Sequence, residues 1–185
     1  QGWQRLLDLL EERTATAYVD LWSEWVVNDA QEAQLTERAE TRALYFEGVA
    51  AAGDWELPEL IRYDLSSWQF EDVVAELEMA DDVLATADAI GELAADLDLT
   101  PPDQLQAAFE GNDGLDVALE EGQSELTAVE DIGKATTGLA ADPGFVAWVG
   151  LLFADPGVEL DAARDAWEEG DNDAAASRAQ GVLVT

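Results

Sequence analysis

The sequence predicts an all-α fold: an irregular antiparallel helical bundle or a short solenoid of helical hairpins, with about eight or nine helices. Two observations predict it. Apolar residues recur at steps of three and four along most of the chain, and a proline-led pattern occurs three times after residue 53. The 185 residues, 48% of them apolar and seven of them tryptophan, are enough for one sizeable core. We therefore expect a single domain over 1–185, with an N-terminal helix pair over 1–53 and three degenerate helical hairpins over 54–185.

The first expected helix covers residues 3–27. Apolar residues keep helical spacing along this range, from Trp3 to Trp25. Thr14 and Thr16 lie inside the range, but β-branched residues lower helix propensity only slightly. The pattern therefore predicts one long amphipathic helix.

The second expected helix covers about residues 30–52. Asn28 or Asp29 precedes it and offers a capping side chain, and Gly53 follows it as a residue that readily ends a helix. Apolar side chains at helical spacing predict the face that packs against the rest of the protein. They are Leu35, Ala39, Ala43, Phe46 and Ala50.

The three hairpins begin at Pro58, Pro102 and Pro156. In each, a proline and an acidic residue open a short helix, an aromatic residue closes it, and a second helix returns after an acidic turn. Proline in the first turn of a helix removes no internal hydrogen bond, and an acidic neighbour suits the positive helix end. Glycine supplies turn conformations in the second and third copies. The closing aromatic residues are Trp68, Phe109 and Trp167.

The helices that return from the first two turns carry apolar residues at alternating steps of four and three. This spacing is typical of long, nearly parallel helices, and frequent Ala and Gly residues allow their backbones to approach closely. We expect about 27 residues in each, a length of roughly 40 Å. The apolar run at 145–154 suits a buried core helix, because it is too short to cross a bilayer.

Both ends of the chain predict a fragment of a longer protein. Helical spacing begins at the third residue, and the last returning helix is much shorter than its two counterparts. We therefore expect this helix to continue beyond Thr185. A membrane span further along the chain is one explanation, and a boundary within an ordinary soluble protein is the other.

The charge of the chain is extreme, with 8 basic and 42 acidic residues and a net charge of −34. Such a field repels phosphate backbones, so nucleic acid is excluded as a partner. Two settings fit the charge. One is the outer side of a bacterial membrane, where the cytoplasmic bias towards Lys and Arg is absent. The other is the salt-rich cytoplasm of a halophile, where screening weakens repulsion between carboxylates. We favour an extracytoplasmic protein with a membrane tether outside these residues.

The segment LDAARDAWEEGDNDAAASRAQGVL, residues 160–183, resembles a tetratricopeptide-type hairpin. The other two copies depart from that pattern through longer second helices and different turns. More loosely, the chain resembles the helical external regions of large membrane-anchored bacterial proteins with no assigned activity. These resemblances imply a scaffold or protein-interaction role, and they transfer no catalytic residue.

The residues for common catalytic and metal sites are missing, because the chain has no His and no Cys. This excludes Ser-His-Asp and Cys-His arrangements, Cys/His zinc sites and the Glu-x-x-His di-iron motif. No phosphate-binding glycine motif occurs either. We therefore predict no catalytic residue, no cofactor and no metal site, and a protein that is not an enzyme.

Some acidic residues still need an interpretation. Asp81 and Asp88 lie next to the row of apolar residues on their helix. They could be buried acids with a raised pKa, but we expect them to reach water. Acidic loops offer weak ligands for a divalent ion, but they lack the spacing of a calcium loop, and helix capping explains them more simply. The loop residues are Asp96, Asp98, Asp103, Asn112, Asp113, Asp116 and the segment 170–173.

Tryptophans at helical spacing predict core or hairpin-junction positions first, Trp148 among them. We expect any ligand groove to lie between hairpins and to use Trp55, Trp68 and Trp167. The leading hypothesis is a non-catalytic extracytoplasmic scaffold or protein-interaction module. The alternatives are a domain that binds a cationic or carbohydrate ligand through acidic and Trp side chains, a soluble halophile-type helical protein and, last, a hydrolase that uses carboxylates alone.

Overall fold

The computed structural model describes residues 2–141 and 155–184, and the run at 145–154 with Trp148 lies outside these ranges. The described residues form helices and no strand, which confirms the all-α prediction. In the described ranges, no helix combines the length and apolar character needed to cross a bilayer. The helices are α1 (Gly2–Thr14), α2 (Val19–Trp25), α3 (Asp29–Ala52), α4 (Glu59–Ser67), α5 (Phe70–Asp96), α6 (Gln104–Glu110), α7 (Leu115–Ala141), α9 (Pro156–Glu168) and α10 (Asn172–Val184).

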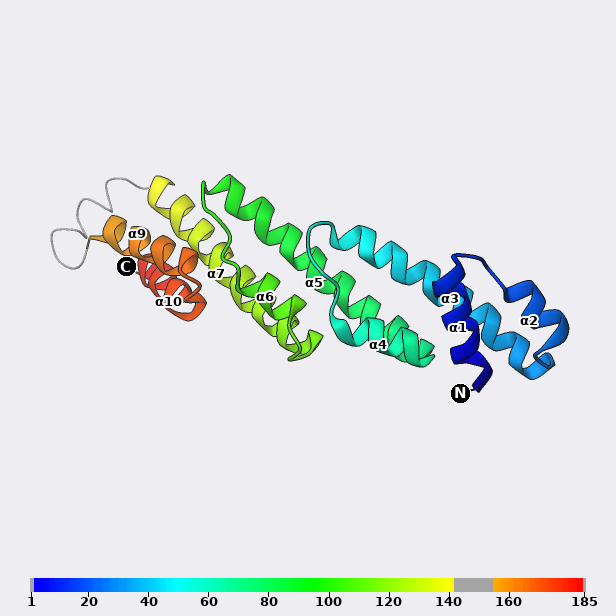
Figure 1. The fold of residues 1–185 in the computed structure, drawn as a ribbon. Coiled ribbons are helices and arrows are strands. Elements are labelled where there is room, and N and C mark those ends of the chain that lie inside the picture. Colours follow the sequence, from blue (N-terminus) through cyan, green and yellow to red (C-terminus); the bar gives the residue numbers. More distant parts are fainter. Residues whose placement is uncertain (1, 142–154, 185) are drawn as a thin grey trace.

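The molecule is elongated, with α1 and α2 at one end and α9 and α10 at the other (Figure 1). The long helices form a row in which α3 packs on α5 and α5 packs on α7. After α3 and after α5, a loop and a short helix bring the chain back before the next long helix begins (Figure 1). The short α4 packs on α5, α6 packs on α7, and α9 and α10 close the row against α7.

The three predicted hairpins are confirmed as α4–α5, α6–α7 and α9–α10. The returning helices α5 and α7 each have the expected length, 27 residues. Gly114 and Gly170 take positive φ angles of 103° and 82° in the later two turns, as a glycine does without steric cost. The first turn has no glycine, and Trp68 itself adopts the left-handed conformation, with φ at 64°.

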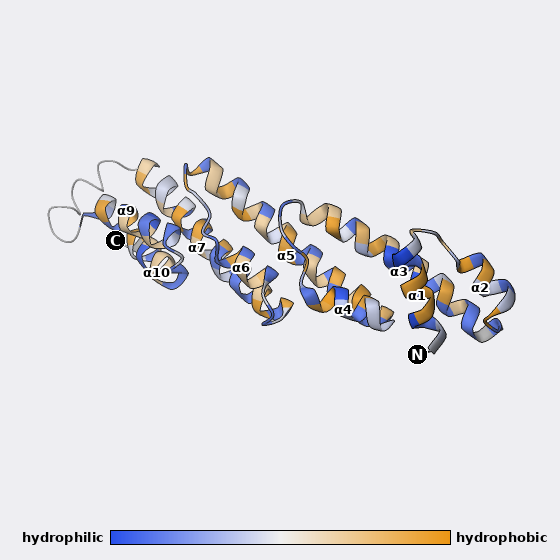
Figure 2. Cartoon of the chain, viewed as in Figure 1, coloured by the Kyte–Doolittle hydropathy of each residue, from blue (hydrophilic) through white to orange (hydrophobic). Residues whose placement is uncertain are grey.

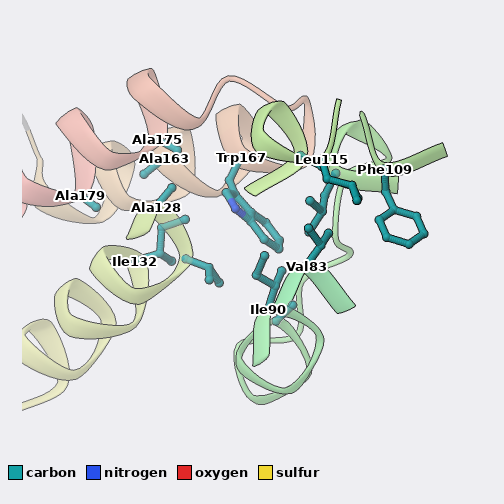
Figure 3. Close-up of a cluster of buried hydrophobic side chains, with 14 of the residues drawn as sticks. Val83, Ile90, Phe109, Leu115, Ala128, Ile132, Ala163, Trp167, Ala175 and Ala179 are labelled. Carbon is teal, nitrogen blue, oxygen red and sulfur yellow. The ribbon is translucent and has the colours of Figure 1, made fainter. Parts of the chain in front are cut away.

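One apolar core runs through all three hairpins. Figure 2 shows the apolar residues of α5 and α7 as stripes along these helices. Trp167 is fully buried and reaches between α7 and α5, where Val83 and Ile90 are also buried (Figure 3). Gly122 allows close packing, because a side chain there would come within 3.1 Å of Thr86 and 3.3 Å of Leu105. Small residues therefore let α5, α6 and α7 approach one another as predicted.

The single helix predicted over 3–27 is wrong. Helix α1 ends at Thr14, α2 begins at Val19, and Ala15 between them takes a positive φ of 50°. The physical reason is that residues 11–16 carry no large apolar side chain, so burial does not hold this stretch in a helix. The Glu11 side chain instead accepts a hydrogen bond of 3.0 Å from the backbone N–H of Tyr18, which stabilises the link.

The bounds predicted for the next helix are confirmed, but its predicted packing face is largely wrong. Asn28 caps α3 and Gly53 ends it, as expected. Of the five predicted face residues only Leu35 is buried, whereas Ala39, Ala43, Phe46 and Ala50 are exposed. The face that packs instead includes Arg38 and Thr41, which are buried because α1 and α5 lie on that side.

Candidate functional site

The structure does not bring Trp55, Trp68 and Trp167 together. Trp167 lies in the core and donates a hydrogen bond from its ring nitrogen to the backbone oxygen of Glu125, at 3.3 Å. Trp55 is half-buried beside Phe109, with 5.4 Å between the ring centroids. Trp68 lies elsewhere, where α1, α3 and the end of α4 meet. These contacts assign Trp167 to the core and the other two to helix junctions.

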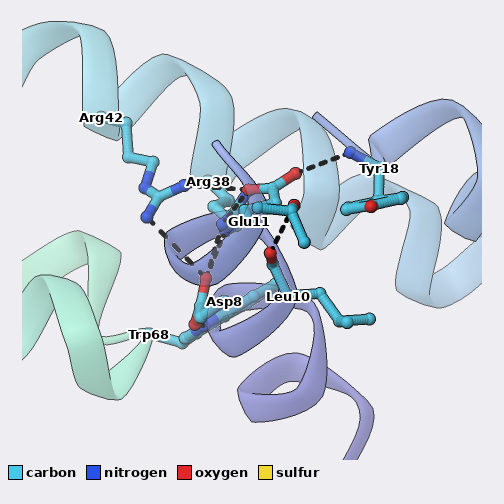
Figure 4. A network of polar contacts seen from close by, with 8 residues as sticks. Asp8, Leu10, Glu11, Tyr18, Arg38, Arg42 and Trp68 are labelled. Carbon is cyan, nitrogen blue, oxygen red and sulfur yellow. Dashed lines mark hydrogen bonds and ion pairs between the residues drawn. The ribbon is translucent and has the colours of Figure 1, made fainter. Parts of the chain in front are cut away.

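The junction around Trp68 is an ion-pair network (Figure 4). Arg38 is only 4% exposed and donates hydrogen bonds to both Asp8 and Glu11 of α1. The Trp68 ring nitrogen donates to the other oxygen of Asp8 at 2.7 Å. Burial alone would raise the pKa of Glu11, but the Tyr18 N–H and the cations Arg38 and Arg42 lower it. The network holds α1 on α3 through Arg38, and the remaining carboxylate oxygens of Asp8 and Glu11 accept hydrogen bonds from Trp68 and Tyr18 (Figure 4).

The acidic residues that the sequence singled out form no metal site. Asp81 and Asp88 are exposed, which confirms that they reach water. Across residues 2–141 and 155–184, no group of three or more acidic side chains is arranged to hold a metal ion. Asp171 caps α10 by accepting a hydrogen bond from the Ala174 N–H, whereas Asp103 makes no such bond at the start of α6. Capping therefore explains part of the acidic loops.

One apolar surface is exposed on α3. We call Ala39, Ala43, Phe46 and Ala50 the outer face of α3; all four are exposed, and Phe46 is 68% exposed. This surface lies in a region rich in exposed apolar side chains: ten of the thirteen large ones among the described residues fall within 6–63. They are Leu6, Leu9, Leu21, Trp25, Val26, Leu44, Phe46, Val49, Leu60 and Tyr63.

A cavity of about 490 Å³ lies where α4, α5 and the turn into α7 meet; we call it the α4–α7 cavity. Its wall includes Glu76 of α5, whose Oε2 atom is shielded from solvent and has no hydrogen-bond partner among the described residues. Burial, and then the neighbouring carboxyl of Asp64, raise the pKa of Glu76 to about 7. The sequence did not predict this site, because its walls come from segments up to 58 residues apart, from Pro58 to Asp116.

A second unusual acid, Glu125, lies between α7 and the last hairpin. It is 1% exposed, and its Oε2 atom also lacks a hydrogen-bond partner within the described ranges. Burial, and then the charge of Glu121, raise the pKa of Glu125 to about 7. Glu121 accepts a hydrogen bond of 3.0 Å from the side-chain amide of Asn172, so this polar group joins α7 to α10. Glu125 is not part of the α4–α7 cavity, and its backbone oxygen accepts a hydrogen bond from the buried Trp167, so we assign it to packing.

Comparison with known proteins adds no family to this description. No protein family matches the chain, and neither a curated protein nor a solved structure matches it.

Proposed function

We propose that the protein is a non-catalytic helical scaffold that binds another protein through the outer face of α3. The observation that carries the proposal is that this row of apolar side chains, spaced as if to pack against another helix, is exposed. The four residues follow one another at steps of four, three and four, the spacing by which helices pack along each other. A partner helix laid along α3 would bury this row.

The surroundings of the outer face support a contact larger than one side chain. Leu44 and Val49 on the same helix are also exposed. The opposite side of α3 already packs on α5 and bonds to α1. Exposed apolar patches of this kind are typical of interaction sites, because monomeric proteins rarely leave large ones in contact with water.

Charge favours a partner with basic residues. Glu40 and Glu47 are exposed on α3 beside the outer face, and the whole chain has a net charge of −34. A second copy of the chain would bring like charges together, whereas Lys or Arg on a partner would be attracted. We therefore propose an amphipathic partner helix with Lys or Arg next to its apolar positions.

Two synthetic helical peptides test the proposal. Both carry a Leu/Ala heptad seam, and the flanking positions are Lys in one and Gln in the other. We expect the Lys peptide to bind more tightly in fluorescence anisotropy, and we expect Phe46→Ser to weaken its binding at least tenfold. Phe46 supplies the largest apolar surface of the face, and its replacement leaves the charge of the protein unchanged.

Val158→Ser provides the matched control. Val158 is 62% exposed on α9, far along the chain from α3, so this variant should bind the Lys peptide like the wild type. Equal binding by the Phe46 and Val158 variants would show that the outer face is not the site. A wild-type dimer in light scattering that Phe46→Ser dissociates would assign the face to a second copy instead.

We further propose that the protein works outside the cytoplasm, tethered to a membrane by sequence outside these residues. Support comes from the strongly acidic composition, which lacks the Lys and Arg bias of cytoplasmic segments next to membranes. The alternative is the salt-rich cytoplasm of a halophile. Protease added to intact cells should digest this part of the full-length gene product; protection until the cells are lysed would favour the alternative.

A further inference from the structure

We infer that the α4–α7 cavity binds a small organic cation with an apolar body, such as an aralkyl ammonium, and that the carboxylate of Glu76 holds the charged group. This inference does not depend on the proposed protein contact at α3. The cavity volume of about 490 Å³ is within the range of small-molecule sites.

The charges around the cavity favour a cation. Glu59, Glu76 and Asp116 line it, and no Lys or Arg is among the described residues of its wall. Helices α4 and α7 begin here, and the N-terminus of each contributes roughly half a positive charge. Glu59 also pairs with Arg62 at 3.5 Å, so Glu76 and Asp116 supply the unpaired negative charge of the wall. Together with the net charge of −34, they attract an ammonium group and repel an anion.

The rest of the wall favours an apolar body on that cation. Leu60, Met79 and Leu115 supply apolar surface from three different helices. Tyr63 also lines the cavity and is exposed, so its ring offers a face to a cation that enters from solvent. This combination of apolar wall and few polar groups is typical of small-molecule sites.

Glu76 lacks a donor when its carboxyl group is ionised, because its neighbour Asp64 is also a carboxyl. Its buried Oε2 atom has no hydrogen-bond partner among the described residues, and a buried acceptor without a partner is unfavourable. An ammonium group in the cavity would donate to it, and a hydrogen bond between two charged groups is stronger than a neutral one. The ligand would therefore replace the proton through which Glu76 otherwise hydrogen-bonds to Asp64.

Binding should depend on pH. Glu59, which pairs with Arg62, and Asp116 share the cavity wall with Glu76. The charged neighbours that act on Glu76 itself are both acidic, Asp64 of α4 and Asp72 of α5. They oppose its ionisation, and burial with these neighbours raises its pKa to about 7. A cation needs the ionised carboxylate, so its binding displaces the proton. Affinity should rise about tenfold or more from pH 5.5 to pH 8.

Isothermal titration calorimetry with 2-phenylethylammonium chloride at pH 8 tests the inference. We expect Glu76→Gln to weaken binding at least tenfold and Glu78→Gln to change it less than twofold. Glu78 is the matched control, because it is exposed on the same helix, lines the groove between α3 and α5 instead, and its replacement changes the charge equally. The uncharged 2-phenylethanol should bind at least tenfold more weakly than the ammonium.

A second variant keeps the test valid if Glu76→Gln alters the fold. Tyr63 is exposed, so Tyr63→Ala should leave the circular dichroism spectrum unchanged and weaken binding several-fold. Equal weakening by the Glu76 and Glu78 variants would assign the affinity to overall charge and overturn the inference. Equal binding of the alcohol, or no heat at millimolar ligand, would overturn it too.

Discussion

The N-terminal helices and the hairpins treat buried carboxylates in opposite ways. Between α1 and α3, Asp8 and Glu11 pair with a buried arginine, Arg38, and the pKa of Glu11 is lowered. In the hairpins, Glu76 and Glu125 have no such cation among the described residues, and the pKa of each is raised to about 7. The network around Arg38 therefore pairs its acids with cations, as Lys134 also does for Asp131 in α7, whereas Glu76 and Glu125 are shifted towards the neutral form.

The difference follows from where the few cations lie. Residues 1–53 hold four of the eight basic residues and 10 of the 42 acidic ones, which leaves four basic and 32 acidic residues for the rest of the chain. With so few cations, a proton is the readiest means of neutralising Glu76 and Glu125, which have no cation beside them among the described residues. The comparison predicts that the stability of the protein falls when a charge of the Arg38 network is removed and rises when the charge of Glu125 is removed. It also predicts that Glu11 and Glu125 contribute to stability over opposite ranges of pH.

The largest expected loss of stability comes from removing Arg38, the cation that pairs with Asp8 and Glu11. Arg38→Met should destabilise the protein by about 3–5 kcal/mol, because Asp8 and Glu11 would remain buried without their cation. Amide hydrogen exchange should show the loss first in α1 and α3. As the control, Arg62→Met removes an exposed arginine that pairs with exposed Glu59 and should cost less than about 0.5 kcal/mol. A similar cost for both variants would mean that the network contributes no more than a surface pair.

The next effect has the opposite sign and lies in the hairpins. Glu125→Gln should stabilise the protein at pH 8 by up to about 3 kcal/mol and have little effect near pH 4, as measured by denaturant unfolding. The pKa of Glu125 is about 7 in the folded state, against 4.5 for a free glutamate side chain, so its stability contribution is complete below pH 4.5. It is lost as the pH rises through 7.

The same pH series distinguishes the two regions. The pKa of Glu11 is lowered, so its contribution is present above pH 4.5 and is lost as the pH falls further. Glu120→Gln, at an exposed position on α7, serves as the control for the Glu125 variant and should not change the pH profile. If both variants raise stability equally at pH 8, relief of general repulsion explains the gain, and burial of Glu125 does not.

Local signals explain why the hairpins were predictable. Proline starts, closing aromatic residues and the four–three spacing of α5 and α7 all act within one hairpin, and Trp167 is buried as its helical spacing indicates. The outer face of α3 could not be predicted, because Arg38 is a polar residue at a buried position. Its partners lie 27 and 30 residues away, in α1, so no local pattern indicates them.

The candidate sites were less predictable than the fold for the same reason. Glu76 and Glu125 are two acids among 42, and only neighbours from other helices distinguish them. Asp64 of α4 approaches Glu76, and the last hairpin covers Glu125. The tryptophans were more conspicuous in the sequence, but Trp167 and Trp55 became packing residues against Glu125 and Phe109.

The smallest expected effect concerns the break between α1 and α2. Ala15 has a φ of 50°, a left-handed conformation that costs an L-residue about 1 kcal/mol and costs glycine little. Ala15→Gly should therefore raise stability slightly, by up to about 1 kcal/mol, although glycine also gains freedom in the unfolded chain. Ala85→Gly is the matched control in the hairpins: Ala85 is exposed within α5, so the same replacement should lower stability by about 1 kcal/mol. In thermal unfolding, a gain in stability for Ala15→Gly and a loss for Ala85→Gly would show backbone strain at Ala15 and regular helix at Ala85. Two losses of equal size would mean that residues 11–18 behave as a helix, as their sequence first indicated.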